Sequence, residues 1–211
     1  MITIAIIVAT CIISFLAFSN QKLMDDLIFY PPAITQQKQW YRFITCGFIH
    51  ADIMHLLFNM YSFYLFSTAV EDAFNQIFGN KGTTLYIVLY FTALVVCLLP
   101  TYFNNKDNYY YRSLGASGAV SAVIFAYIFL QPTTPIGLMF IPIHAPAFIF
   151  GILYLGVTYY LARRGNSGIN HSAHFWGAVY GIVFVIVTSY LLSNFDPVSN
   201  FLLKIKFEYG G

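Results

Sequence analysis

Six apolar stretches, separated by shorter polar segments, dominate the pattern of this chain. They cover roughly residues 2–19, 53–70, 83–101, 115–131, 147–162 and 172–193. A helix that crosses the hydrocarbon of a bilayer needs about 20 mostly apolar residues, and each stretch comes close to that length. The pattern predicts an all-α, polytopic membrane bundle of six transmembrane helices.

Two of the segments between these stretches carry signals of their own. The segment from Asp25 to Ala51 is too polar to span, yet it is rich in aromatic side chains that favour the membrane interface, where we expect it to lie. Between the fourth and fifth stretches, prolines interrupt an apolar segment and favour a loop against the bilayer. These prolines are Pro132, Pro135, Pro142 and Pro146.

Composition supports lipid as the main surroundings of the chain. Apolar residues make up 59% of the 211 residues and charged residues 9%, against about 25% charged residues in ordinary globular domains. No segment is polar enough to enclose a separate core, so we expect residues 1–211 to form one membrane domain. The net charge of +2 is scattered along the chain, which argues against a nucleic-acid partner.

The first apolar stretch is expected to stay in the protein as a spanning helix, and the alternative is a cleaved signal peptide. Its first basic residue is Lys22, which follows the stretch, so the basic start of a cleavable signal peptide is missing. With six spans, the second, fourth and sixth helices then enter the membrane from the same side and run parallel.

Polar residues stand near the beginning of each of these three parallel helices. His55 and Asn59 lie in the second span, Ser117 in the fourth and His174 in the sixth. With a rise of 1.5 Å per residue, all four lie within about 10 Å of one depth. Polar side chains inside spans are costly and usually face the bundle interior, so we expect these four to meet there.

Ser117 is flanked by small residues in the sequence Gly115-Ala116-Ser117-Gly118. The glycines Gly115 and Gly118 let a ligand approach the backbone, and the free N–H groups of a helix N-terminus can bind an anion. Small residues are also common where membrane helices pack. Taken alone, the four-residue motif favours packing over chemistry.

His174 opens a helical face of small residues. Gly177 and Gly181 follow it at offsets of three and seven, and such a face lets another helix backbone pack closely. Small residues of the fourth span, including Gly118, are suitable partners, and this packing would bring the Ser117 hydroxyl within reach of His174. Nucleophilic catalysis requires that geometry, although a lone histidine is more often a satisfied buried residue.

The other polar residues at this level suggest supporting roles. No acidic residue lies inside a span, and Asp52, just before the second, is the one acidic candidate for a catalytic triad. His50 and Asn59 are available as donors to an oxyanion. His55 shares a helix face with Asn59, and for it we favour an interhelical hydrogen bond that holds the bundle together.

Taken together, these motifs resemble the signature of the rhomboid intramembrane serine proteases. The matching residues are His50, His55 and Asn59 in HADIMHLLFN, Ser117 in GASG and His174 in AHFWGAVYG. The resemblance also covers Trp40 and Arg42 in the first long loop and Glu71 after the second span, and so extends over the whole chain.

The resemblance implies specific roles for these residues. Ser117 would be the nucleophile and His174 the general base, while His50, Asn59 and the backbone N–H of Ser117 would form the oxyanion hole. His55 would be a structural member of its motif. The substrates would be transmembrane segments of other membrane proteins, cut near their outer end, and no metal or other cofactor is implied.

The chain departs from the family pattern at two positions near these motifs. Tyr41 separates Trp40 from Arg42, which are commonly adjacent in the family. Ser121 stands where many members have an aromatic residue that stacks on the catalytic base. His174 would then be held by another ring, such as a neighbouring tyrosine, or be held less firmly.

The membrane orientation rests on two conflicting signals. The resemblance implies a cytoplasmic amino terminus and, in a bacterium, an active site toward the outer face of the plasma membrane. The positive-inside rule counts the other way, because most basic residues then lie outside. These outer basic residues are Lys22, Lys38, Arg42, Lys106, Arg112, Arg163 and Arg164, against Lys81, Lys204 and Lys206 inside.

Two other functions are compatible with parts of this sequence. A non-catalytic relative would bind or escort membrane proteins with the same fold, but the presence of both Ser117 and His174 favours the enzyme. A metal or haem site would use several histidines without the glutamate that a metalloprotease requires. The histidines in question are His50, His55, His171 and His174.

Overall fold

The computed structural model describes residues 2–137, 144–164 and 168–210. The described residues form eleven α-helices, two short 3₁₀ turns at Cys46–Phe48 and Gly79–Lys81, and two three-residue strands. The helices are α1 (Ile2–Phe18), α2 (Gln21–Leu27), α3 (Pro31–Gln37), α4 (Arg42–Thr45), α5 (Ile53–Phe78), α6 (Gly82–Val96), α7 (Leu99–Asn105), α8 (Ser117–Leu130), α9 (Ala147–Arg164), α10 (His171–Leu192) and α11 (Pro197–Tyr209).

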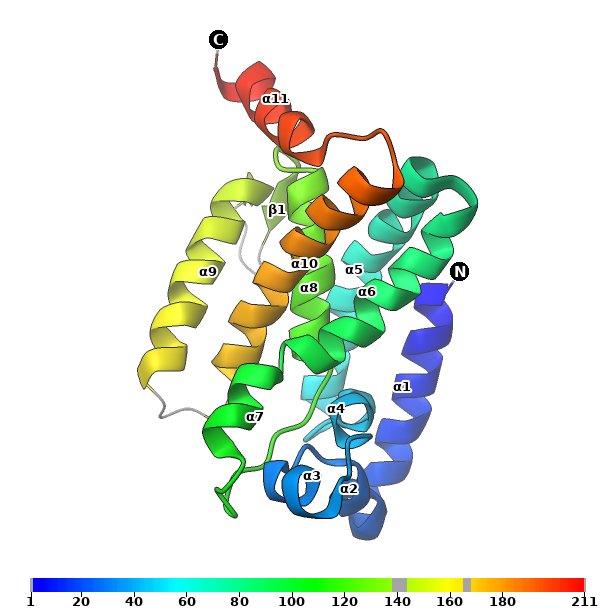
Figure 1. Cartoon of the computed structure of the whole chain (residues 1–211), viewed down its shortest axis with the longest axis vertical. Helices are drawn as coiled ribbons and strands as arrows, with labels where there is room; N and C mark the ends of the chain where they lie inside the picture. The colour runs from blue at the N-terminus through cyan, green and yellow to red at the C-terminus, as the bar shows by residue number, and fades with distance from the viewer. Residues whose placement is uncertain (1, 138–143, 165–167, 211) are drawn as a thin grey trace.

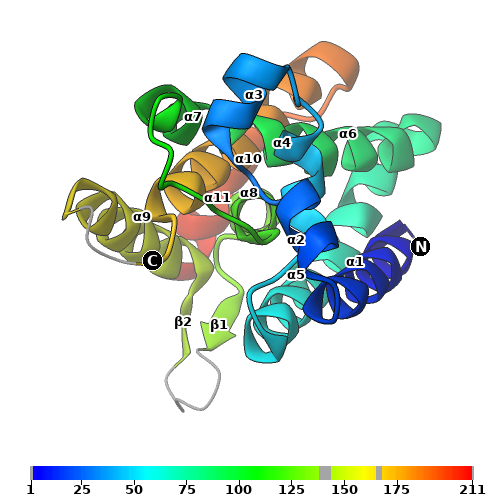
Figure 2. The ribbon, with the colours of Figure 1, turned by 90° about the horizontal axis from the view of Figure 1, so that it is seen from below.

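Helix α8 is the centre of the bundle. It contacts α5, α6 and α10, with the largest contact to α10, and these helices surround it when the molecule is viewed from below (Figure 2). Helix α1 packs on α5 at one edge, and α9 packs on α10 and α8 at the other (Figure 1). Its burial agrees with this central position, because eleven of the fourteen residues of α8 are buried.

Each of the six apolar stretches is helical in the structure. The helix at the second stretch, α5, extends to Phe78, well past residue 70, and the third stretch divides into α6 and α7 near Pro100. By length and composition alone, two described helical runs could cross a membrane, Ile53–Asn105 and His171–Leu192. Helices α1 and α8 are apolar but shorter. The all-α bundle predicted from the pattern is confirmed.

Two short paired strands lie in the segment for which the sequence predicts only a loop. Strand β1 (Pro135–Gly137) pairs antiparallel with β2 (His144–Pro146), so that Pro135 lies opposite Pro146. Proline cannot donate a backbone hydrogen bond, and an isolated two-stranded edge tolerates it. Pro142 lies outside the described residues, and the prediction of a membrane-facing loop is untested there.

Helix α1 shows how the apolar surface is distributed in this bundle. Its buried positions are largely small or hydroxyl-bearing, and its exposed positions are large and apolar, which reverses the order of a soluble helix. Lipid solvates apolar side chains, so the outer face of such a helix needs no cover. The buried residues are Thr3, Ile6, Thr10, Ser14 and Ala17, and large exposed ones are Ile4, Val8, Ile12, Phe15 and Leu16.

Glu71 of α5 fixes the beginning of α1. Its carboxylate accepts hydrogen bonds from the backbone N–H groups of Ile2, at 2.8 Å, and Thr3, at 3.2 Å, and from the Thr3 hydroxyl at 2.8 Å. The first N–H groups of a helix lack partners within the helix, and a negative charge is favourable there. Glu71 therefore attaches α1 to α5 at the end of the bundle where α1 begins.

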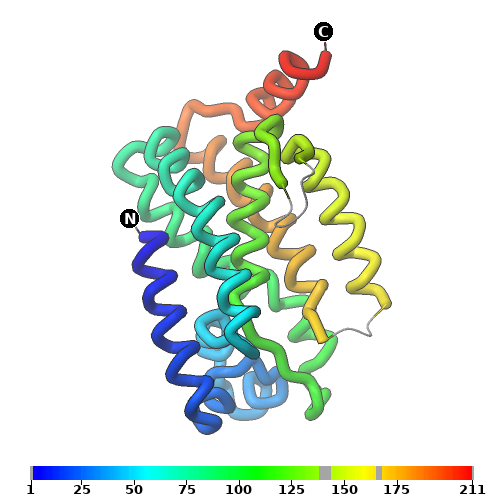
Figure 3. Tube along the Cα trace, turned by 180° about the vertical axis from the view of Figure 1, so that it is seen from behind, coloured from blue at the N-terminus to red at the C-terminus, as the bar shows by residue number. Residues whose placement is uncertain are grey.

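The segment between α1 and α5 folds into short helices at the other end of the bundle, where α2 and α3 lie (Figure 3). Arg42 holds this segment together, because its Nη1 donates to the carbonyl oxygens of Asp25, at 2.8 Å, and Ile28, at 2.7 Å. Trp40 stacks on Phe43 with their ring planes 7° apart. Although Tyr41 lies between them, Trp40 and Arg42 therefore both make contacts within this segment.

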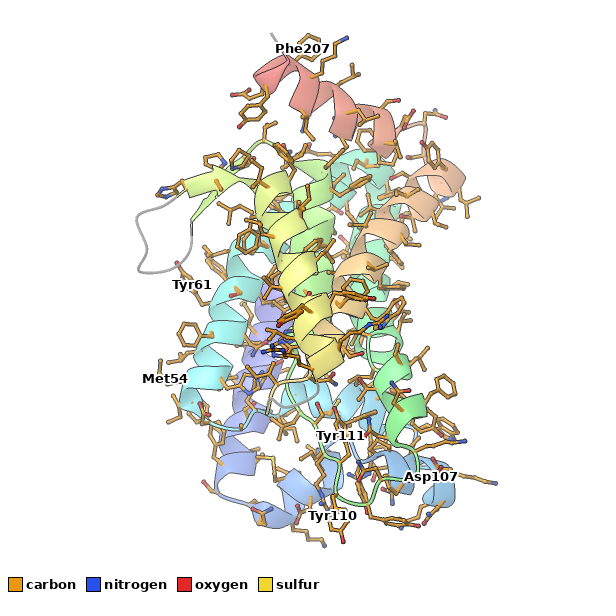
Figure 4. All side chains as sticks on the ribbon, turned by 90° about the vertical axis from the view of Figure 1, so that its left-hand side faces the viewer. Met54, Tyr61, Asp107, Tyr110, Tyr111 and Phe207 are labelled. Atoms are coloured by element: carbon orange, nitrogen blue, oxygen red, sulfur yellow. The ribbon has the colours of Figure 1, made fainter. Side chains whose placement is uncertain are left out.

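Helix α11 crosses the end of the bundle opposite these short helices. Figure 4 shows Phe207 of α11 at one end and Asp107 and Tyr110 at the other. Lys204 joins α11 to the centre, since its Nζ donates to the Leu130 carbonyl oxygen at 3.0 Å. That oxygen lies at the C-terminus of α8, where a positive charge is favourable.

Candidate active site

Helices α5, α8 and α10 all begin at the same end of the bundle, as Figure 1 shows. Their first turns surround a cavity of about 520 Å³, which also reaches the loop before α8 and the end of α6. The lining includes Asn59, His55, Ser117 and His174, together with the glycines Gly115 and Gly118. The structure therefore brings together polar residues that are up to 119 positions apart in the sequence.

Ser117 and His174 form a hydrogen-bonded pair within this cavity. The Ser117 Oγ lies 2.7 Å from the His174 Nε2, a short distance for such a bond. An imidazole nitrogen that accepts the hydroxyl proton of a serine can act as its general base. The ring of His171 lies edge-on to His174 at 5.9 Å between centroids, one helical turn earlier.

Close contact between the backbones of α8 and α10 sets this short distance. A Cβ placed on Gly177 would lie 2.0 Å from the Gly118 carbonyl oxygen, and one placed on Gly181 would lie 2.0 Å from the Ala122 carbonyl oxygen. Both values are far below any van der Waals contact, so the present spacing of the helices excludes every side chain at these two positions. The small-residue face expected from the sequence forms this contact.

Gly115 and the N-terminus of α8 shape the cavity wall beside Ser117. Gly115 has a φ of +106°, and a Cβ at this position would lie 2.8 Å from Cε1 of His55. Both observations require glycine. Ser117 is the first residue of α8, and no side chain caps that helix. The backbone N–H groups of its first turn are therefore available to an anion.

His55 presents a hydrogen-bond donor to the same cavity. Its Nδ1 accepts from the backbone N–H of Ala51 at 3.4 Å, and a neutral imidazole carries its proton on the nitrogen that is not accepting. The proton is therefore placed on Nε2, close to Gly115. Asn59, one turn later, is 7% exposed, and its Nδ2 donates to the His55 carbonyl oxygen at 2.9 Å, which leaves a second N–H.

The geometry does not support His50 as an oxyanion donor. Its side chain is fully buried and does not line the cavity. The Ser14 hydroxyl donates to the Phe48 carbonyl oxygen at 2.9 Å and lies 3.0 Å from His50 Nδ1, so that this nitrogen must carry the proton. Its Nε2 is then an acceptor, buried and without a partner among the described residues.

Burial also keeps the His50 ring neutral, because it lowers the pKa of His50 to about 3. The ring of His50 packs edge-on against that of His55 at 5.0 Å between centroids. His55 therefore lines the cavity, and the His50 ring lies buried behind it. In the sequence, the offset of four residues indicates that His55 lies on the same helix face as Asn59.

A tyrosine reaches Ser121, the position where an aromatic ring was missing. Tyr154 of α9 places its hydroxyl 2.8 Å from the Ser121 Oγ, and Ser121 donates to the Ser117 carbonyl oxygen at 2.8 Å. The sequence predicted either a tyrosine ring against His174 or a base held less firmly. Tyr154 contacts Ser121 instead, and the one ring paired with His174 among the described residues is that of His171. Tyr154 thereby links α9 to the first turn of α8.

The other sequence-based candidates have ordinary structural partners. Asp52 caps α5, because its Oδ1 accepts from the His55 backbone N–H at 2.8 Å, and so its carboxylate is already engaged. The histidines form two edge-on ring pairs, His50 with His55 and His171 with His174. In the described part of the chain, no group of three or more potential ligands is arranged to hold a metal ion.

A second, mostly apolar cavity of about 370 Å³ also reaches Ser117 and His174. Its walls come from α5, α8 and α9 and include Phe58, Tyr61 and Tyr154. Figure 4 shows Tyr61 at the outer side of α5. Large side chains of this wall, such as Phe58, are exposed on the outer surface of the bundle.

The fold and the site together define a class: helical-bundle proteins with a serine–histidine pair at the level where three parallel helices begin. A sequence model described as Rhomboid domain matches residues 37–191, most of the chain. This protein belongs to the rhomboid family, whose members are integral membrane proteins. The family assignment suggested by the three motifs is confirmed.

Named relatives come from bacteria and from eukaryotic organelles. "Rhomboid protease GlpG" of Haemophilus influenzae is 24% identical over 193 residues, which is 90% of this chain and 92% of the relative. "RHOMBOID-like protein 12, mitochondrial" of Arabidopsis thaliana is 33% identical over 151 residues, 66% of this chain and 44% of the relative. The chain thus spans less than half of that longer relative.

"Presenilin-associated rhomboid-like protein, mitochondrial" of Rattus norvegicus is 26% identical over 156 residues, which is 72% of this chain and 39% of the relative. These names include a protease as well as rhomboid-like proteins. Similarity therefore establishes the family, and the chemistry of this chain depends on its own site residues.

Proposed function

We propose that this protein is an intramembrane serine endopeptidase that cuts peptide bonds in or near the transmembrane segments of other membrane proteins. The observation that carries the proposal is the 2.7 Å hydrogen bond between Ser117 Oγ and His174 Nε2. This pair lines a cavity together with donors that suit an oxyanion. A merely structural serine would not need such surroundings.

In the proposed reaction, His174 Nε2 takes the hydroxyl proton as Ser117 Oγ attacks the carbonyl carbon of the substrate. His174 then gives that proton to the leaving amine, and the C–N bond breaks. Water, deprotonated by His174, hydrolyses the acyl-enzyme and releases the second product. Among the described residues the His174 ring has no hydrogen bond to a carboxylate, and Asp52 caps α5, so the proposed reaction uses the pair alone.

Negative charge develops on the substrate carbonyl oxygen during the attack. The donors proposed for it are the backbone N–H of Ser117, the Nε2–H of His55 and the free N–H of Asn59. Each is fixed before the substrate arrives, by the N-terminus of α8 or by bonds to Ala51 and to the His55 carbonyl oxygen. Donors held in place in this way stabilise the transition state without reorganisation.

The apolar cavity supports a route from the lipid to this site. Its walls on α5, α8 and α9 extend from exposed side chains such as Tyr61 to Ser117 and His174. A substrate helix would enter from the side, and unwinding would then expose one of its peptide bonds to Ser117. The products would be two shorter membrane-protein fragments.

A fluorophosphonate probe tests the proposed nucleophile without any knowledge of the substrate. The purified chain in detergent should be labelled at Ser117, and the label should disappear in Ser117→Ala and fall sharply in His174→Ala. Mass spectrometry of the labelled peptide identifies the modified residue. Labelling that persists in a folded Ser117→Ala protein would contradict the assignment.

The same variants separate the protease from a rhomboid-like protein that only binds membrane proteins. A reporter with a transmembrane segment should be cut by the wild-type chain and left intact by Ser117→Ala. Cleavage by a folded Ser117→Ala protein would disprove the mechanism.

A further inference from the structure

Helix α11 lies beyond the part of the chain that matches the Rhomboid model. The match covers residues 37–191, and α11 runs from Pro197 to Tyr209. The helix lies at the end of the bundle opposite the candidate active site, as Figure 1 and Figure 3 show. Ser117 begins α8 and Leu130 ends it, so about 20 Å of helix separates the site from this end. The proposed reaction therefore uses no residue of α11.

Side-chain contacts hold α11 in one position across the bundle. Asp196 caps its first turn, since its Oδ1 accepts from two backbone N–H groups there, at 3.1 and 3.0 Å, and from the hydroxyl of Tyr190 on α10, at 2.8 Å. Phe201 stacks on Phe129 of α8, with the ring centroids 5.0 Å apart and the ring planes at 19°. These contacts decide which face of α11 is covered and which is exposed.

The outward surface of α11 combines apolar flanks with a polar centre. Leu202, Leu203 and Phe207 are 60%, 50% and 85% exposed, and Figure 4 shows Phe207 at this end of the molecule. The exposed residues Ser199 and Lys206 are seven positions apart, so they share a helix face that lies between these apolar side chains. Such a helix is typical of the boundary between lipid headgroups and acyl chains.

A narrow groove of about 160 Å³ lies beneath α11, between α8, α9 and α10. All of its lining residues are apolar, and Gly151 of α9 keeps it open. A Cβ at Gly151 would lie 3.3 Å from Ile128 Cγ2 and 3.5 Å from Phe125 Cε1, and both of these residues line the groove. Ile152, another lining residue, is 66% exposed, so the groove opens on the outer surface of the bundle.

The dimensions and polarity of the groove suit a single acyl chain. On α9 the lining runs from Phe148 to Leu155, which is about 10 Å along the helix axis. An apolar void loses dispersion energy on its empty side, and acyl chains surround the bundle of an integral membrane protein. A transmembrane helix of another protein, about 10–12 Å across with its side chains, is too wide for this groove.

Lys204 places a positive charge beside the groove. It follows Phe201, a lining residue, by three positions on the same side of α11. Its Nζ donates to the Leu130 carbonyl oxygen at 3.0 Å and to Gln131 Oε1 at 2.8 Å, and an ammonium group has three N–H donors. In the described part of the chain Lys204 makes no ion pair, although Glu208 lies one turn later. The third N–H is therefore free for the phosphate of a lipid.

We propose that the groove beneath α11 binds one anionic phospholipid of the adjacent leaflet. One of its acyl chains lies against Gly151, between α8 and α9, and its phosphate accepts from Lys204 Nζ. An anionic lipid is favoured because no carboxylate among the described residues neutralises Lys204, whereas the cationic group of a zwitterionic lipid would offset the attraction. The inference is independent of the proposed proteolytic function.

Native mass spectrometry of the full chain in detergent tests this site. The delipidated protein is titrated with phosphatidylglycerol and, separately, with phosphatidylcholine, and the Kd of the first bound lipid is measured. We expect phosphatidylglycerol to bind about fivefold more tightly, the effect of one lysine near an anionic headgroup. Lys204→Gln should abolish this preference and Lys204→Arg should retain it. Lys206→Gln is the matched control and should keep the preference, because Lys206 is exposed on the opposite face of α11.

Filling the groove tests the acyl-chain part of the proposal. Gly151→Leu places a side chain in the groove, and we expect it to weaken the first binding of both lipids about tenfold, the effect of about two buried methylenes. Gly156→Leu on the same helix is the control, because a Cβ there meets nothing within 4 Å. Thermal unfolding shows whether the variants are folded. If Gly151→Leu does not fold, Ile152→Trp at the mouth of the groove is compared with Leu153→Trp, whose exposed side chain is not part of the lining.

Four outcomes would overturn the inference. The first is an equal Kd of the two lipids for the wild-type chain, and the second is an equal Kd for folded Gly151→Leu and Gly156→Leu. The third is loss of the preference in Lys206→Gln as in Lys204→Gln, which indicates unspecific attraction. The fourth is displacement of the lipid by glycerol 1-phosphate, which indicates a site for phosphate alone. Fluorophosphonate labelling of Ser117 should be equal in all these variants, so a failure here remains distinct from a failure of the proposed nucleophile.

Discussion

At the residue scale, the two histidines near the start of α5 differ in which ring nitrogen carries the proton. Ala51 donates to His55 Nδ1, and Ser14 accepts from His50 Nδ1. The first ring therefore offers an N–H to the cavity, whereas the second offers a buried acceptor. One backbone amide and one hydroxyl on α1 thus decide which histidine presents an N–H to the cavity.

We expect His55→Ala to lower kcat by about a hundred- to thousandfold with a smaller change in KM, because it removes one oxyanion donor. Cleavage of a reporter in detergent measures both constants. His50→Ala should act differently, by destabilising the fold, since the ring is fully buried. A His50→Ala protein as stable as the wild type, but with a hundredfold lower kcat, would restore His50 as the donor.

Ser14 is expected to contribute to the site although it lies on α1. Ser14→Ala leaves both the Phe48 carbonyl oxygen and His50 Nδ1 without their hydroxyl partner, and we expect a loss of about 1–3 kcal/mol in stability. Thermal unfolding in detergent measures the change. Thr10→Val is the matched control, because the buried Thr10 hydroxyl has no hydrogen-bond partner in the described part of the chain.

At the element scale, the contact between α8 and α10 is the structural basis of the site. The backbones of the two helices are in close contact at Gly177 and Gly181. The Ser117–His174 pair lies at the end of this interface where both helices begin. Helix association in lipid depends on such close packing, since burial of apolar surface contributes little there. The spacing of two helices therefore controls a hydrogen bond between side chains.

Gly181→Ala should force α8 and α10 apart, since its Cβ would lie 2.0 Å from the Ala122 carbonyl oxygen. We expect a loss of about 1–3 kcal/mol, together with weaker fluorophosphonate labelling of Ser117. Gly156→Ala on α9 is the control, because a Cβ there meets nothing within 4 Å. Equal unfolding temperatures for the two variants would contradict a packing role for Gly181.

At the scale of the whole molecule, the two ends of the bundle differ in charge. Lys22, Lys38, Lys106 and Arg112 belong to the end that holds the site, while Lys204 and Lys206 lie on α11 at the other. The charge rule would place the site end in the cytoplasm. We propose the opposite orientation, in the plasma membrane of a bacterium, because the rhomboid motifs are more specific than the charge count.

Cysteine labelling in intact cells tests this orientation. Lys106→Cys should react with a membrane-impermeant maleimide added outside, and Lys206→Cys should react only after the membrane is permeabilised. The unsubstituted chain gives the background, since Cys46 and Cys97 are buried and Cys11 is partly buried. The reverse labelling pattern would place the active site on the cytoplasmic side.

The sequence by itself determined the helical bundle, the family and the residues that gather at one level. Length and apolarity define each helix locally, and the parity of six spans places Ser117 and His174 at the same end. The glycines of α10 also signalled its close packing, because no other residue type permits that approach. These features depend on local pattern and on the order of elements along the chain.

The tertiary structure alone decided the partners of individual side chains. It placed His55 and not His50 at the cavity, brought Tyr154 to Ser121 and attached Ser14 to His50. It also paired residues 135–137 with residues 144–146, in a segment where the prolines predict only a loop. Each of these outcomes depends on the rotation of a helix about its own axis or on pairing between distant backbone groups, which a one-dimensional pattern of apolar and polar residues does not encode.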